Sequence, residues 1–293
     1  MLRLTRRSYP LSSQGNRVID KAPRPTDQAK TGTSSPSLLV VLAHPDDESL
    51  ACGGLIAWCA ATGIKVSLLC LTHGENGQTN NLDLVALSSS LKSVRRAELE
   101  RAAAVLGITE VIVGNHEDGM LPWIEPELVE SDILEAIKRL HPETVITFGA
   151  DGLYWHPDHI AVHERATAVV ASLGDDGPAL YYVTLPAGAM RTVVNHAMQV
   201  WDKQNLSTPR PESILGVTNI DAFGEGAATP TLVITTRKFS VPKLKALVCH
   251  QSQLRDSALL FVSEKDAPRL LATEHYRRAN VGTKEPSFLE QFR

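Results

Sequence analysis

The regular alternation of short apolar runs with helical segments is the feature that most restricts the fold of this 293-residue chain. Four apolar runs suit strands that are covered on both faces, and a segment of helical pattern follows each one. The expected strands are residues 38–43, 65–71, 110–113 and 144–148, and the expected helices are 55–62, 93–106, 127–140 and 157–172. Short strand–helix connections place strands in parallel with right-handed crossovers. The pattern therefore predicts an α/β fold: a Rossmann-like, doubly wound, mostly parallel sheet with helices on both faces.

The alternation becomes less regular after residue 180. Strands are expected at 181–184 and 231–234, and helices at 241–253 and 268–278. No repeat or linker divides residues 37–293, so we expect a single domain. Within it, the segment 185–229 is expected to be irregular and, like many loops over strand ends, to determine substrate specificity.

Residues 1–36 differ from the rest in composition. They are rich in Pro, Ser and Thr, with seven Lys and Arg against two Asp. Such a segment buries little apolar surface, so we expect a basic N-terminal extension, either solvated or contributing to contacts in a homo-oligomer. It contains no apolar core of a secretory signal.

Charge and cysteine content exclude several classes of function. A net charge of −4 and a pI near 6.2 argue against a nucleic-acid partner. No apolar run reaches eighteen residues, so no membrane span is expected. The four cysteines have neither disulfide-framework nor zinc-finger spacing. We expect free thiols and a cytoplasmic location.

The loop after the first expected strand is AHPDDE, residues 43–48. A dinucleotide-binding protein would place a glycine-rich turn here, so that backbone N–H groups could bind phosphate. An imidazole and three carboxylates occupy this position instead. They would repel phosphate and suit a cation, which argues against a nucleotide cofactor.

The loop after the fourth expected strand is DGLYWHPDH, residues 151–159, and contains a second His-Pro-Asp tripeptide. Ligands of doubly wound sheets bind at the carboxyl ends of the strands, so both loops are expected at one site. A catalytic zinc site needs three nitrogen or oxygen ligands and one open position. Two histidines and one carboxylate would meet that count and leave further titratable groups for proton transfer.

These motifs resemble those of the PIG-L/LmbE-type zinc N-deacetylases. The resemblance covers residues 38–253, with AHPDDE at 43–48 and HPDH at 156–159 as its specific marks. LTHGENG (71–77), RRAELERAAAVLG (95–107), DG (118–119) and KALVCHQSQ (245–253) follow the family's order. The segment at 274–276 is weakly similar to mycothiol-pathway deacetylases.

The resemblance implies that His44, Asp47 and His159 are the ligands of one Zn²⁺ ion, for which another divalent metal could substitute. It implies that Asp46 is the general base for the zinc-bound water. It also implies that His156 protonates the departing amine or stabilises the oxyanion.

Further roles are expected for residues around this centre. Tyr154 would help polarise the substrate carbonyl, and Asp158 would orient His156. Arg95 would contact the substrate, although its neighbour Arg96 is an alternative. Two more residues are candidate substrate contacts: Asp118, otherwise a turn or supporting residue, and His250, otherwise a packing residue.

The implied activity is hydrolysis of an N-acyl amide, in the first place N-acetyl, on a small molecule that contains an amino sugar. Zinc would polarise the carbonyl and lower the pKa of its bound water. Two alternatives remain at this point. One is a zinc amidase for a larger acyl or thiol-conjugate amide, and the other is a non-catalytic descendant that binds sugar or metal.

Overall fold

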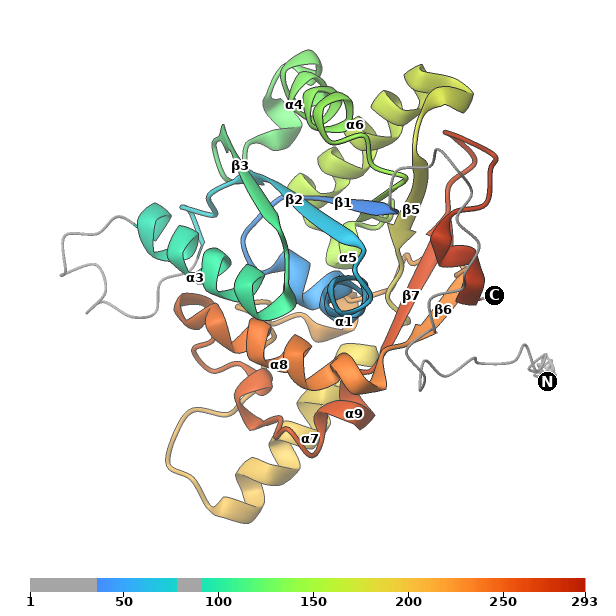
Figure 1. Cartoon of the computed structure of the whole chain (residues 1–293). Coiled ribbons are helices and arrows are strands. Elements are labelled where there is room, and N and C mark those ends of the chain that lie inside the picture. The colour runs from blue at the N-terminus through green and yellow to red at the C-terminus, as the bar shows by residue number, and fades with distance from the viewer. Residues whose placement is uncertain (1–35, 78–90, 293) are drawn as a thin grey trace, which may run out of the picture.

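A seven-stranded sheet forms the centre of the computed structural model, which describes residues 36–77 and 91–292 (Figure 1). The strand order is β3-β2-β1-β4-β5-β7-β6. Strands β1 to β5 are parallel, while β7 runs antiparallel to both β5 and β6. The strands are β1 (Ser37–Leu42), β2 (Lys65–Thr72), β3 (Glu110–His116), β4 (Thr144–Phe148), β5 (Ala179–Val183), β6 (Leu232–Thr235) and β7 (Thr273–Arg278). The predicted fold class is confirmed.

Helices cover both faces of the sheet, with α1, α3 and α8 on one side and α4 and α6 on the other (Figure 1). The helices are α1 (Asp47–Ala61), α3 (Leu91–Leu106), α4 (Pro126–Leu140), α5 (Gly152–Trp155), α6 (Pro157–Leu173), α7 (Ala189–Gln204), α8 (Ser240–Cys249) and α9 (Ala267–Leu270). Because helices cover β1 and β4 on both faces, these strands are buried along nearly their whole length. This explains their continuous apolar sequence. The basic extension, except for Pro36, lies outside the described residues.

The order of the strands determines where a ligand can bind. The chain passes from β1 to β2 and β3 on one side, and β4 then lies on the other side of β1. The direction of winding therefore reverses between β1 and β4. At such a switch point the loops after the two strands diverge and leave a crevice at their carboxyl ends. The two His-Pro-Asp motifs lie in these loops.

Two predicted segments differ from the structure. Part of the segment expected to be irregular forms helix α7, whose buried residues belong to a second apolar cluster away from the main core. Residues 268–278, expected to be one helix, contain only the end of the short helix α9 and then strand β7. Strand β7 pairs with β5 and β6 through its buried Tyr276, and this pairing outweighs the local helical pattern.

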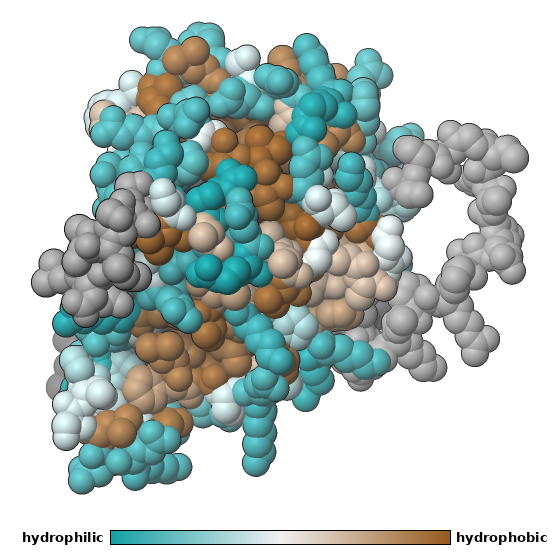
Figure 2. All heavy atoms as spheres, turned by 60° about the vertical axis from the view of Figure 1, so that its left-hand side comes forward, coloured by the Kyte–Doolittle hydropathy of each residue, from teal (hydrophilic) through white to brown (hydrophobic). Residues whose placement is uncertain are grey.

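The described part of the chain contains no helix long and apolar enough to cross a membrane. Figure 2 shows one face of the molecule, where hydrophobic areas lie between hydrophilic side chains. All four cysteines are free thiols, three of them buried.

Candidate active site

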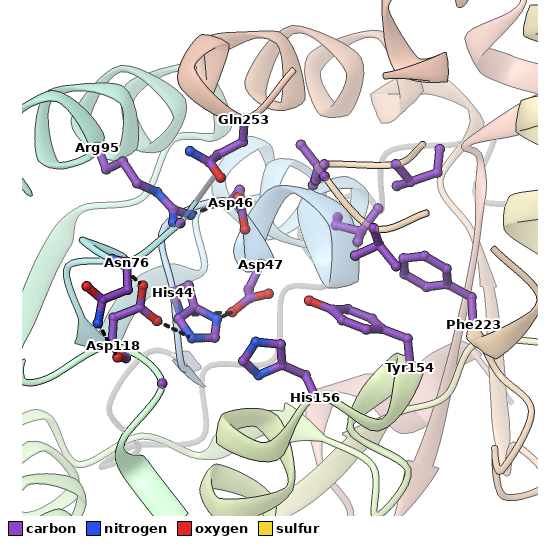
Figure 3. Close-up of a pocket in the computed structure, with 17 residues that line it drawn as sticks. His44, Asp46, Asp47, Asn76, Arg95, Asp118, Tyr154, His156, Phe223 and Gln253 are labelled. Carbon is purple, nitrogen blue, oxygen red and sulfur yellow. Dashed lines mark hydrogen bonds and ion pairs between the residues drawn. The ribbon is translucent and has the colours of Figure 1, made fainter. Parts of the chain in front are cut away.

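A cavity of about 310 Å³ lies at the carboxyl ends of the parallel strands, where the loops after β1 to β4 meet the segment before β6 (Figure 3). This volume is in the range of small-molecule sites. Its labelled lining residues are His44, Asp46, Asp47, Asn76, Arg95, Asp118, Tyr154, His156, Phe223 and Gln253.

Three side chains from the two His-Pro-Asp loops converge beside this cavity: His44 and Asp47 line it, and His159 is fully buried against them. Nδ1 of His44 lies 3.2 Å from Nε2 of His159. The Asp47 carboxylate lies 3.2 Å from the same His159 nitrogen and 3.4 Å from His44 Nδ1. Ligands at 2.0–2.1 Å from a tetrahedral zinc ion are separated by about 3.3–3.4 Å. Oδ1 of Asp47 makes the contact with His159 and Oδ2 the contact with His44, so each pair of side chains has the spacing of two ligands of one metal ion.

The other nitrogen of each ring faces only hydrogen-bond acceptors. His159 Nδ1 is 3.1 Å from the carbonyl oxygen of Gly152. His44 Nε2 is 3.1 Å from both the Asp118 and the Asp158 carboxylates. The protons therefore belong on these nitrogens, and the inner nitrogens present lone pairs to each other and to Asp47. Three electron-rich atoms in contact are stabilised by a cation between them, so these residues fit a metal.

The charges around His44 favour the same conclusion. Burial lowers the pKa of His44, but its hydrogen bonds to Asp118, Asp158 and Asp47 outweigh burial and raise it well above the usual value. Burial raises the pKa of Asp47, but His159 and His44 hold it well below the usual value. Carboxylates that favour a proton on the His44 ring also favour a metal cation beside it.

Two other groups of described residues are close enough to hold a metal, and both contain His44. One adds Asp118 and Asp158, whose oxygens face the outer nitrogen of His44. These two carboxylates also accept backbone N–H bonds, Asp118 from Asn76 and Asp158 from Gly119. The other group adds His156 and His159. His44, Asp47 and His159 remain the set in which each side chain contacts the other two.

Asp46 lies beside this set in a strained backbone conformation, with φ 108°. Its carboxylate accepts a hydrogen bond from Arg95 Nη2 at 2.9 Å, and its N–H donates to Glu48 at 3.0 Å. Burial raises the pKa of Asp46 and Arg95 opposes this, which leaves it at about 7. A cavity carboxylate with a pKa near neutrality is suited to proton transfer.

Arg95 itself is 4% exposed, and it also donates to the carbonyl oxygens of Pro45 and Gly74. Arg96 instead pairs with Glu100 on the helix surface at 2.7 Å. Of the two arginines left open by the sequence, Arg95 is the one that lines the cavity.

His250 is fully buried behind Asp46 and does not line the cavity. Its Nε2 lies 2.9 Å from Glu48. Burial lowers the pKa of His250, but Glu48 raises it overall, and His250 in turn lowers the pKa of Glu48 against the effect of burial. Of the two alternatives for His250, the structure shows packing and not a rim contact.

His156 stands at the edge of the cavity next to the metal-binding set, with its ring 4.8 Å from that of His44. Its Nδ1 accepts the backbone N–H of Asp158 at 3.2 Å. The Asp158 carboxylate meets Gly119, Leu121 and His44, so the expected carboxylate–His156 pair is not what the structure contains. Burial, and then the neighbouring histidines, lower the pKa of His156 to about 4. At pH 7 the ring is neutral with its proton on Nε2.

Tyr154 lies between His156 and Phe223, with ring centroids 5.7 and 4.8 Å away. Its neighbours Leu153 and Trp155 have left-handed backbone angles, φ 64° and 65°. Non-glycine residues adopt this conformation rarely, and it is concentrated at functional sites. The strained turn directs the tyrosine ring into the cavity (Figure 3).

Several cavity or supporting residues were not among the sequence-based candidates. Asn76, Gln253 and Glu48 lie in motifs that mark the family resemblance, so the motifs could have indicated them. Phe223 and the segment 214–217 lie in a part of the sequence without a recognisable pattern. Their position depends on how this segment folds over the strand ends.

Comparisons with known proteins agree with this geometry. Residues 39–170 match the family model for GlcNAc-PI de-N-acetylases. The curated 1D-myo-inositol 2-acetamido-2-deoxy-alpha-D-glucopyranoside deacetylase of Actinosynnema mirum is 32% identical over 84% of this chain and 93% of its own length. A corresponding deacetylase 2 of Catenulispora acidiphila is 30% identical over 85% and 90%. The chain belongs to the PIG-L family of de-N-acetylases.

Solved structures show the same fold at low sequence identity. The N,N'-diacetylchitobiose deacetylase of Pyrococcus horikoshii has a TM-score of 0.57 at 19% identity, covering 84% of each chain. The 4-carboxy-2-hydroxymuconate hydratase GalB of Pseudomonas putida has a TM-score of 0.55 at 19% identity, covering 86% of this PIG-L family chain and 99% of its own. Because a hydratase shares the fold, the reaction has to be argued from the site.

Proposed function

We propose that this protein is a zinc-dependent deacetylase that removes the N-acetyl group from the amino sugar of a small-molecule conjugate. The observation that carries the proposal is the convergence of His44, Asp47 and His159 lone pairs beside the carboxylate of Asp46. The relatives named as deacetylases of a 2-acetamido-2-deoxy-glucopyranoside support the substrate class. The cytoplasmic location stays a prediction.

His44, Asp47 and His159 would hold the metal. When bound, the ion supplies a polarised carbonyl and an acidified water. Asp46 accepts a proton from the attacking water while the oxygen of that water adds to the acyl carbon. The carbon–nitrogen bond then breaks, and Asp46 returns the proton to the departing nitrogen. The second proton of the water passes from the carboxylic acid to the amine, so that the products at neutral pH are a carboxylate and an ammonium group.

The resemblance left two roles open for His156, protonation of the amine and stabilisation of the oxyanion, and its protonation state favours the second. A group with a pKa of about 4 is neutral at pH 7 and is a poor store of protons. Its Nε2–H can instead donate a hydrogen bond to the developing oxyanion. The Tyr154 hydroxyl points into the same cavity, toward Asp47, and we assign it a share of that task (Figure 3).

The remaining polar residues position the reactants. Arg95 holds Asp46 in place and favours its ionised form. Asp118 keeps the proton of His44 on Nε2, and with Asn76 it offers polar groups to sugar hydroxyls. His250 and Glu48 fix the backbone of Asp46 from behind.

The test is product formation from a panel of 2-acetamido sugars: N-acetylglucosamine, N,N'-diacetylchitobiose and the N-acetylglucosaminyl inositol of the relatives' names. Zinc-loaded protein should release amine and acetate in equal amounts from at least one compound. Asp46→Asn should release neither at a comparable rate. Absence of amine above this control for the whole panel would overturn the proposal.

A further inference from the structure

The cavity has an apolar half that the hydrolysis of an acetyl group does not require. Its apolar lining residues belong to one continuous cluster. They are Leu50, Tyr154, Ile214, Leu215, Val217 and Phe223. Figure 3 shows Tyr154 and Phe223 on one side and Asn76 and Asp118 on the other, with His44 between them.

The opposite half is polar and closely packed. Asn76 is bound to Asp118 through its backbone and its side chain. A Cβ at Gly77 would lie 2.6 Å from Arg95 Nη1 and 2.9 Å from Gln253 Oε1, so these groups share one wall. This half offers hydrogen-bonding groups to a hydroxylated sugar.

The geometry of the amide determines which part of the substrate lies in which half of the cavity. Its carbonyl carbon must lie beside Asp46 and the metal-binding set, and its acyl chain and sugar leave that centre in opposite directions. With the sugar on the polar side, the acyl chain lies against the apolar side. An acetyl group offers one methyl to this lining, in which Tyr154, Leu215 and Val217 are partly exposed in front of three buried apolar side chains.

The backbone at Leu215 gives an independent argument. Ile214 and Val217 exchange two backbone hydrogen bonds of 3.0 and 2.9 Å around a two-residue turn, with φ 47° at Leu215 and 83° at Gly216. Positive φ at both central positions of a two-residue turn is the requirement of type I′, whose first position favours Asn, Asp or Gly and disfavours Leu. Leu215, the residue that this turn disfavours, lines the cavity. This is expected when backbone strain is retained for function.

We infer that this enzyme prefers N-acyl amino sugars whose acyl chain is longer than acetyl, and that Leu215 contacts that chain. The inference rests on the proposed deacetylase function and specifies the acyl group that the same site accepts.

The test compares kcat/KM for N-acetyl, N-butanoyl, N-hexanoyl and N-octanoyl glucosamine, each as the same glycoside. Burial of each further methylene should raise kcat/KM about fourfold until the apolar half is filled. A fall from N-acetyl to every longer chain would overturn this inference and leave the deacetylase proposal standing. Failure to hydrolyse any of the four would overturn both.

The variant Leu215→Asn removes the leucine side chain but keeps the turn, because Asn-Gly is the preferred pair at the centre of this turn type. The variant should keep or raise its melting temperature, while the ratio of N-octanoyl to N-acetyl kcat/KM falls roughly tenfold. The matched control is Leu260→Asn, at a leucine that is 53% exposed and does not line the cavity, and its ratio should equal that of the wild type. An unchanged ratio in Leu215→Asn would overturn the inference.

A second variant extends the cavity. Leu50 also lines a neighbouring cavity of about 190 Å³, with Leu153 and Met190 among its walls. Leu50→Ala would join the two spaces, so the preferred chain should become longer. If the folded variant preferred an acyl chain of the same or shorter length than the wild type does, the placement of the acyl chain against Leu50 would be contradicted.

Discussion

Arg95 should set the pH at which the enzyme becomes active, through its ion pair with Asp46. The two groups are 2.9 Å apart and almost entirely buried. An opposite charge at this distance lowers the pKa of a carboxyl group by about 1–3 units. Arg95→Met should therefore raise the pKa of Asp46 from about 7 by that amount.

The direction of the effect on activity follows from the ionised form being the base. At pH 7 about half of Asp46 is ionised when its pKa is about 7. A rise of one unit leaves about a tenth ionised, and larger rises leave less. A bound metal cation lowers this pKa in the variant and the wild type alike, so the difference between them remains.

The assay is kcat/KM between pH 5 and 10 with metal-loaded protein. In Arg95→Met, the acidic limb of the pH profile, where activity rises with pH, should move to higher pH. The activity should recover at alkaline pH. Arg95→Lys, which keeps the charge, should move the limb less. Arg96→Met is the matched control on the same helix, and its limb should not move. An unshifted limb in an active Arg95→Met, or a loss that alkaline pH does not restore, would refute the argument.

Three further predictions concern the surrounding histidines. His156→Ala should lower turnover by about 10²–10⁴-fold while keeping its metal, and any decline of wild-type activity at alkaline pH should persist in the variant because His156 is already neutral there; metal analysis and pH profiles check this. Asp158→Asn should weaken metal binding about 10–100-fold in a chelator competition, since it removes the negative charge of one of the two carboxylates that face His44 Nε2. His250→Ala should destabilise the fold by about 3–5 kcal/mol in urea unfolding at pH 7, because it leaves Glu48 buried without its partner. The ion pair of Glu48 and His250 stabilises the wild type at pH values between the lowered pKa of Glu48 and the raised pKa of His250, because both groups are charged there. The difference in the free energy of unfolding between wild type and variant should therefore shrink below and above that pH range.

The parallel part of the fold could be predicted because its strands are buried on both faces. Such strands must be apolar along their length, so β1, β2 and β4 are recognisable in the sequence. Helix α7 also carries a helical pattern, with Met190, Val193, Val194 and Ala197 buried at spacings of three and four. Strand β7 has no such local signal, since its burial depends on pairing with β5 and β6.

The meeting of the two His-Pro-Asp loops could be predicted from the rule for strand ends. The partners of the individual side chains could not. Asp158 binds the backbone of Gly119 and Leu121 because the loop after β3 lies against the start of α6. His250 is buried because α8 packs on α1 and brings it to Glu48. Both contacts join segments distant in the sequence.

The metal content of three proteins tests the central claim most directly: the wild type, Asp47→Ala and Asp46→Asn, each measured by elemental analysis beside its turnover. Asp47 is proposed to hold the metal and Asp46 to act on the water, although the two are adjacent in the chain. We predict about one zinc per chain in the wild type and in an inactive Asp46→Asn, and little in Asp47→Ala. Full metal in Asp47→Ala, or its loss from Asp46→Asn, would contradict the account.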